Sequence, residues 1–243
     1  MRHSTLAVLG AALLAATGRA ADGRDVPTPA PLAPSLMLPE PPPPVAGAPT
    51  LSLVWFDPQA SLPEGSEATW REVASIFHGI GVDVRWTRGG LGTVYGASAL
   101  PEIPVILLPD DPSRARADEH VMGLVMRQQE PSRAIWVFLR SVRWTLGHPL
   151  WRRKPSNEAE SRDLALALAR VVAHEVVHSI APDEPHSHGG LMRHSLNRRF
   201  LLGKGAPLDP QCAAAFLVRL AALLPAPGVP PSSGLRSVPV AGP

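Results

Sequence analysis

Residues 171–192 read VVAHEVVHSIAPDEPHSHGGLM, and this stretch decides which fold and chemistry to expect. His174, Glu175 and His178 form an H-E-x-x-H pattern within it. Residues four positions apart lie on one face of an α-helix, so both imidazoles can bind the same metal ion while Glu175 lies beside them as a base. Zinc fits this pattern because it accepts imidazole nitrogen and, in catalytic sites, keeps one coordination position open.

The sequence around the motif predicts a helix with one apolar side. Asn157 and Glu160 can form a capping box at its start, and Pro182 ends it. Opposite the histidines, small and branched apolar residues form a stripe that predicts a buried face: Ala165, Ala169, Val172, Ala173, Val176 and Ile180. The alternative interpretation is a core helix that carries two incidental histidines.

A catalytic zinc ion needs a third protein ligand. No glutamate follows Glu184, which excludes an arrangement in which a later helix supplies a glutamate ligand. The residues that remain are His186, His188 and His194, all of which follow the predicted helix closely. The residues by themselves leave the choice among these histidines open.

The spacing HExxH-x7-HSxxGLM resembles the metzincin clan of zinc metalloproteases, and more narrowly the small secreted bacterial proteins with matrixin-like features. In that group the histidine of the HSxxGLM segment is the third zinc ligand. The resemblance therefore implies that His174, His178 and His186 bind Zn2+. It also implies that Met192 belongs to a Met-turn and lies beneath the metal.

The chain departs from the standard metzincin spacing at two positions. Ala181 stands where that pattern has glycine, and Glu184 stands where it has the third histidine. This departure leaves His188 as an alternative third ligand. The identity of the residue that stabilises the oxyanion is also left open. His188 and His194 are close to the motif in the sequence, whereas Tyr95 is far from it.

The resemblance implies a secreted or periplasmic zinc-dependent endopeptidase that hydrolyses peptide bonds. Zinc lowers the pKa of its bound water to about 7 in such sites, and Glu175 would then act as the general base. One alternative is a non-catalytic, zinc-stabilised interaction module of the cell envelope, which would not require Glu175. A second is a metal hydrolase that acts on non-peptide amides of the cell wall.

The ends of the chain read as processing and linker segments. Residues 1–20 have the basic, apolar and small-residue order of a secretory signal peptide, with cleavage expected after Ala20. An uncleaved anchor is the alternative. Residues 21–49 are predicted to be a proline-rich linker, residues 50–225 a metalloprotease-like domain, and residues 226–243 a disordered tail.

Composition restricts the partners. The formal net charge is +2, and neither a basic tract nor an aromatic-basic ladder indicates nucleic acid. The single cysteine, Cys212, allows no intramolecular disulfide and is expected to be a small core residue. We therefore expect a peptide or protein substrate, no nucleic acid, no stable membrane insertion after signal cleavage, and a monomer.

The order of predicted elements indicates an α/β (α+β), metzincin-like fold. Strands are expected at 51–56, 82–86, 103–108, 121–126 and 134–139, and helices at 68–77, over the motif, and from Asp209 onward. This order predicts a mixed, mostly parallel sheet. By resemblance to metzincins, 121–126 would be the edge strand along the cleft. We expect 141–155 to be a loop whose Trp144 and Trp151 cover the core, with a substrate rim as the alternative.

Overall fold

The computed structural model describes residues 47–62, 66–89, 102–109, 121–127, 133–148 and 155–224. These residues build a five-stranded sheet with the order β2-β1-β3-β5-β4. The strands are β1 (Thr50–Phe56), β2 (Asp83–Arg88), β3 (Glu102–Leu108), β4 (Gly123–Arg127) and β5 (Arg133–Phe138). All neighbouring pairs are parallel except β4 with β5, which is antiparallel. The predicted mixed, mostly parallel sheet is confirmed, and β4 forms its edge beyond β5.

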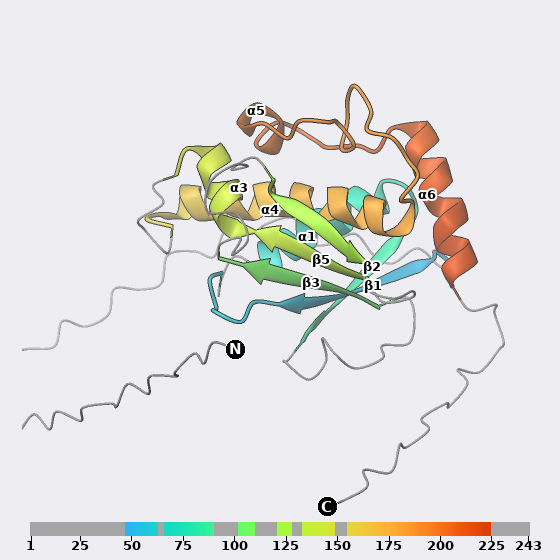
Figure 1. The fold of residues 1–243 in the computed structure, drawn as a ribbon, viewed down its shortest axis with the longest axis horizontal. Coiled ribbons are helices and arrows are strands. Elements are labelled where there is room, and N and C mark those ends of the chain that lie inside the picture. The colour runs from blue at the N-terminus through green and yellow to red at the C-terminus, as the bar shows by residue number, and fades with distance from the viewer. Residues whose placement is uncertain are drawn as a thin grey trace, which may run out of the picture. The chain divides into compact units, whose positions relative to one another are not determined.

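One face of the sheet is buried, because apolar side chains alternate along its strands. Leu53 and Ile103 are neighbours in the β1–β3 register, and Val105 and Ile135 are neighbours in the β3–β5 register. All four are at most 3% exposed. Two helices, α1 (Ser66–His78) and α4 (Glu158–Ile180), lie together over this sheet (Figure 1). The core therefore lies between the sheet and the helix that carries the H-E-x-x-H motif.

The predicted N-cap residue Asn157 fixes the start of α4, and the Glu160 side chain bonds to the residue before the cap instead of to the Asn157 amide. The Asn157 carboxamide oxygen accepts a hydrogen bond from the Glu160 amide at 2.8 Å. The Glu160 carboxylate in turn accepts one from the Ser156 amide at 2.7 Å. Helix α4 continues to Ile180, shortly before Pro182, which has no amide hydrogen to extend it. All residues of the predicted apolar stripe are buried.

The chain after α4 crosses the side of this helix that faces away from the sheet (Figure 1). It contains the short α5 (Arg198–Leu201) and ends in α6 (Pro210–Leu223), which Asp209 caps through a 2.9 Å hydrogen bond from the Gln211 amide. On α4, Arg170 is only 1% exposed and donates hydrogen bonds to the carbonyls of Phe200 and Gly203. A buried arginine thus fastens this segment to the motif helix through backbone atoms.

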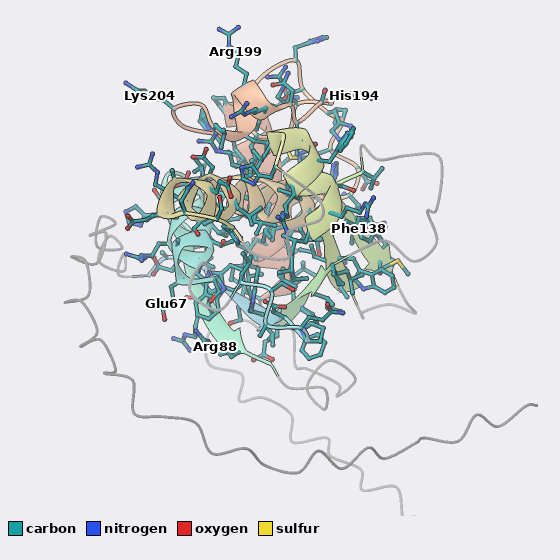
Figure 2. All side chains as sticks on the ribbon, turned by 90° about the vertical axis from the view of Figure 1, so that its left-hand side faces the viewer. Glu67, Arg88, Phe138, His194, Arg199 and Lys204 are labelled. Carbon is teal, nitrogen blue, oxygen red and sulfur yellow. The ribbon has the colours of Figure 1, made fainter. Side chains whose placement is uncertain are left out.

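A cluster of tryptophans packs β1 and β2 against α1. Trp70 and Trp86 are stacked with centroids 5.6 Å apart, and Trp55 meets both edge-on. Outside them, Arg88 lies over the Trp70 ring and 3.7 Å from the Glu67 carboxylate. Figure 2 shows Glu67 and Arg88 on the opposite side of the molecule from His194. This cluster therefore stabilises the fold at a distance from the histidine-bearing segment.

The prediction of a loop from 141 onward was wrong at its start, because α3 (Leu139–Leu146) occupies this position. Leu139, Val142 and Leu146 give it a buried side, and Gly147 ends it in the left-handed conformation with φ 74°. Trp144 is 49% exposed, so it does not cover the core as expected. Trp151 lies outside the described residues.

Several predictions concern residues that the structure does not describe. The signal peptide, most of the proline-rich linker, the C-terminal tail and Tyr95 lie outside the described ranges. Within those ranges, no helix has both the length and the apolar character that crossing a membrane requires. Cys212 is 6% exposed, as expected of a core residue.

Candidate metal centre

Three histidines converge at the C-terminal part of α4. The Nε2 atoms of His174 and His178 are 3.1 Å apart, and the Nε2 atom of His186 lies 3.1 Å from that of His178 and 3.3 Å from that of His174. The first two come from successive turns of the helix, and the third comes from the segment after it. One ligand atom from each residue therefore points into the same small volume.

The triangle of nitrogens has the size that a zinc ion requires. Tetrahedral zinc with Zn–N bonds of about 2.0–2.1 Å separates its nitrogen ligands by roughly 3.3 Å. The observed separations of 3.1 to 3.3 Å match this value. Three imidazoles with one side open are also the ligand set of a catalytic rather than a structural zinc site. The residues present therefore fit zinc.

A backbone hydrogen bond orients the first of these histidines. Nδ1 of His174 lies 2.9 Å from the Leu191 carbonyl oxygen, so it carries the hydrogen and Nε2 keeps its lone pair for a metal. The Leu191 amide donates to the Pro207 carbonyl at 2.9 Å. Gly190 precedes it with φ 66°, and a side chain there would meet the Pro207 carbonyl oxygen at 2.6 Å. The segment that brings His186 to the site is thus held to α4 by its own backbone.

Burial keeps the histidines in their ligand form. It lowers the pKa of His178 to about 4, and the neighbouring His174, His186 and Arg127 act in the same direction. Burial also lowers the pKa of His174 and that of His186, which is the more exposed of the two side chains. Neutral imidazole is the form that binds a metal, so the cluster is ready to bind at neutral pH without first losing protons.

Glu175 is the neighbour of His174 in the helix and is not a member of the three-histidine group. It is 8% exposed, and burial raises the pKa of its carboxyl group to about 7. Its side chain packs against Gly123, the first residue of β4, so closely that a Cβ atom there would be 2.7 Å from its Cγ. The missing side chain of Gly123 therefore provides the space that Glu175 occupies. Because burial penalises its charge, this carboxyl group readily holds a proton.

The histidines and Glu175 line a cleft of about 510 Å³ between α4, β4 and the segment after α4. Along one side run residues of β4 and the two residues before it, including Val121, Leu124 and Val125. The cleft has the size of a small-molecule or peptide site. Among the described strands, β4 pairs only with β5, so its other edge is the side on which an extended peptide could add.

The remaining residues singled out in the sequence differ in position. His194 lines the cleft, and its ring centroid is 5.5 Å from that of His186. His188 is exposed and is not a member of the three-histidine group. Met192 is fully buried, and its carbonyl accepts a hydrogen bond from the Ser187 amide at 2.7 Å. The roles of His186 as ligand and of Met192 as the base of the site stay predictions.

Sequence reasoning did not single out three residues that the structure brings to the site. Gly123 makes room for Glu175, Arg127 lines the cleft, and Arg170 holds the segment beyond the third histidine. A glycine at the start of an apolar strand is a signal of close approach by another group. A lone arginine in the otherwise apolar run 164–173 is a signal of a buried polar partner. Arg127 gave no comparable signal.

No protein-family model and no curated protein matches the chain. The solved structures that match the chain include the following two. A zinc-dependent peptidase from Methanocorpusculum labreanum (strain Z) is 15% identical, with 68% of this chain and 99% of that chain covered and a TM-score of 0.45. Archaemetzincin from Methanopyrus kandleri is 14% identical, with 71% and 95% covered and a TM-score of 0.41. Because these sequence identities and TM-scores are low, residue roles are not transferred from the two proteins and are argued from the geometry of this chain.

Proposed function

We propose that the protein is a zinc-dependent endopeptidase. One observation carries the proposal: three imidazole nitrogens 3.1 to 3.3 Å apart lie in an open cleft, with a buried carboxyl group on the neighbouring helix residue. His174, His178 and His186 would hold the metal. Zinc bound by them would supply a Lewis acid that polarises a peptide carbonyl and makes water more acidic.

Glu175 would move the protons of the reaction. Its carboxylate is placed by the helix beside the histidines and by Gly123 in the cleft wall. It would take a proton from the attacking water and pass it to the nitrogen of the departing amine. A metal cation nearby would lower the pKa of Glu175 from its value of about 7 toward its ordinary range, so the carboxylate form would prevail at neutral pH.

The edge strand favours a peptide as the substrate. An extended peptide could pair its backbone with the free edge of β4 and place one peptide bond next to Glu175. Val121, Leu124 and Val125 supply an apolar wall for its side chains. This arrangement supports a role in endopeptidase chemistry over hydrolysis of a small amide, because residues of β4 from Gly123 to Arg127 run along the cleft.

We further propose that the protein is exported and of the matrixin-like type. The order of residues in 1–20 supports a cleaved signal, and the HSxxGLM segment supports His186 as third ligand and Met192 as a Met-turn residue. Intact mass of the exported protein tests the first point, with the mature chain expected to begin at Ala21. Retention of Met1 in the exported protein would contradict it.

The decisive experiment compares the zinc-loaded protein with its Glu175→Gln variant on a diverse peptide library. Gln keeps the size of Glu but cannot accept the proton, so cleavage should fall by about 10²-fold or more while zinc content stays unchanged. Equal cleavage by the two proteins would show that Glu175 is not the base. A zinc-loaded parent that cleaves no peptide would favour a non-catalytic, zinc-stabilised interaction module instead.

A further inference from the structure

The cleft contains one permanently cationic side chain. Among the described residues that line it, Arg127 is the only arginine or lysine, and Glu175 is the only carboxylate. Arg127 is exposed, and none of the acidic side chains in the described ranges pairs with it. An exposed arginine that lies in a substrate cleft and pairs with no described carboxylate is a candidate for recognising an anionic group.

A second arginine, Arg133, makes the closer contact with the end of the helix. Arg127 and Arg133 are direct neighbours in the β4–β5 register, and both reach the C-terminal end of α4. Arg133 donates a part-buried hydrogen bond to the Ser179 carbonyl. Arg127 donates to the His178 carbonyl at 3.4 Å, which is beyond the usual range for a hydrogen bond. Arg133 therefore caps the helix, whereas this long bond is the one hydrogen bond that Arg127 makes to a described residue, which leaves most of its five N–H donors for a ligand.

We propose that Arg127 binds a carboxylate of the peptide substrate and makes the enzyme selective for peptides that carry a carboxylate near the scissile bond. The inference rests on the proposed endopeptidase function and adds a substrate class to it. Arg127 is suited to this role because the planar guanidinium matches a carboxylate with two parallel hydrogen bonds. The carboxylate could belong to an Asp or Glu side chain or to the C-terminus of the peptide.

The length of β4 limits the distance between this carboxylate and the scissile peptide bond. Gly123, which contacts Glu175, and Arg127 are the first and last residues of β4. Their Cα atoms are about 13 Å apart at the usual rise of a strand. An extended peptide alongside β4 covers that distance with roughly four residues. The recognised carboxylate therefore lies within about four residues of the scissile bond.

Binding can be measured separately from cleavage. In the zinc-loaded Glu175→Gln protein, fluorescence anisotropy would compare a neutral peptide blocked at both ends with peptides that carry one Glu at each position in turn. A further peptide would be neutral but have a free C-terminal carboxylate. We expect the best carboxylate peptide to bind about three- to tenfold more tightly than the neutral peptide, as for a partly exposed arginine–carboxylate pair.

Arg133 offers a matched control, because it is the same residue type on the neighbouring strand and does not line the cleft. Arg127→Gln should abolish the preference for the carboxylate peptide, and Arg133→Gln should keep it. Arg127→Glu should reverse it, so that a peptide with Lys at the same position binds best. A thermal unfolding curve for each variant checks that the protein is folded.

The outcomes separate the inference from the function on which it rests. Equal binding of neutral and carboxylate peptides, or equal loss of preference in the Arg127 and Arg133 variants, would overturn the inference. A gain for the internal Glu peptide alone identifies a side-chain carboxylate, and a gain for the free C-terminus alone identifies a chain end; either supports it. If the Arg127-dependent preference is present but the parent with Glu175 cleaves nothing, the proposed function fails while carboxylate binding by Arg127 stands.

Discussion

Replacing Gly123 by alanine tests how Glu175 is positioned. The added Cβ would lie 2.7 Å from Cγ, 3.0 Å from Oε1 and 3.1 Å from Cδ of Glu175. Ordinary contacts between such atoms begin at 3.4 Å, so the two groups must separate by up to about 0.7 Å. The Glu175 side chain can rotate whereas the β4 backbone is held in the sheet, so the carboxylate is the group that moves.

The expected result is a loss of turnover without a loss of metal or stability. A displacement of about 1 Å of a reacting group can cost about 10²-fold in rate. We therefore expect kcat/KM for a peptide to fall between about 10- and 100-fold in Gly123→Ala. Zinc content should be unchanged because the three atoms nearest to the added Cβ all belong to Glu175. Alanine is also better than glycine in a strand by roughly 0.5–1 kcal/mol, which offsets the strain in part.

Gly189 provides the control for this experiment. It lies in the segment between His186 and Met192, and a Cβ added to it would meet nothing within 4 Å. Gly189→Ala should therefore cleave like the parent. Wild-type kcat/KM in folded, zinc-loaded Gly123→Ala would refute the reasoning. Loss of zinc from the same variant would show that the contact supports the metal site and not the carboxylate alone.

Three further predictions concern the same site. His186→Ala should weaken zinc binding by more than about 100-fold, which is the largest loss of affinity expected for a residue that only supports a ligand. His188→Ala should not cause such a loss. Equal losses in a zinc titration would contradict His186 as the ligand. Met192→Leu roughly conserves volume and should cost less than about 1.5 kcal/mol with zinc stoichiometry intact, so loss of zinc from the folded variant would contradict a supporting role. In the metal-free protein the pKa of Glu175 is raised from 4.5 to about 7, so its burial costs nothing below pH 4.5 and up to about 3 kcal/mol above pH 7. Urea unfolding in chelator should therefore show Glu175→Gln more stable than the parent at pH 8 and nearly equal at pH 4.5, and the same difference at both pH values would contradict the assignment.

The helix and sheet that carry the site were predictable because their signals are local. Asn157 and Glu160 are the capping pair in the structure, as their spacing indicated. The alternation in β3 and β5 marks strands with one buried face, and their bounds agree with the predicted ranges to within one residue. The spacing of His174 and His178 placed both nitrogens on one side of α4. Each of these relations acts within a few residues of the chain.

Helix α3 was missed because its signals are weak and compete with others. It follows β5 directly, and its N-cap residue Phe138 makes no side-chain capping bond. Leu139, Val142 and Leu146 have helical spacing over only eight residues, which is too short to predict a helix from periodicity. Gly147, which ends the helix in the left-handed conformation, was the clearest available signal.

The supporting contacts of the site could not be predicted because they join distant parts of the chain. Nothing in the sequence near Gly123 says that the side chain of Glu175 will lie against it. The approach of His186 to the other two histidines depends on a turn closed by the Pro207 carbonyl. The sequence offered three histidines for this position, and only the path of the chain after α4 distinguishes them.

The way in which the segment 191–207 is attached to α4 has a consequence for how the protein can change in evolution. Arg170, His174 and the Leu191 amide all bond to carbonyl oxygens of the segment 191–207, which every amino acid provides. The exposed side chains of the segment are therefore free to vary while its position relative to the helix stays fixed, whereas the buried Leu191, Met192 and Leu201 are restricted to apolar residues. Homologues would then diverge at the exposed positions of this region, whereas an arginine four residues before the first histidine of the motif should persist. A search for an R-x3-HExxH pattern would find such proteins where overall sequence similarity does not.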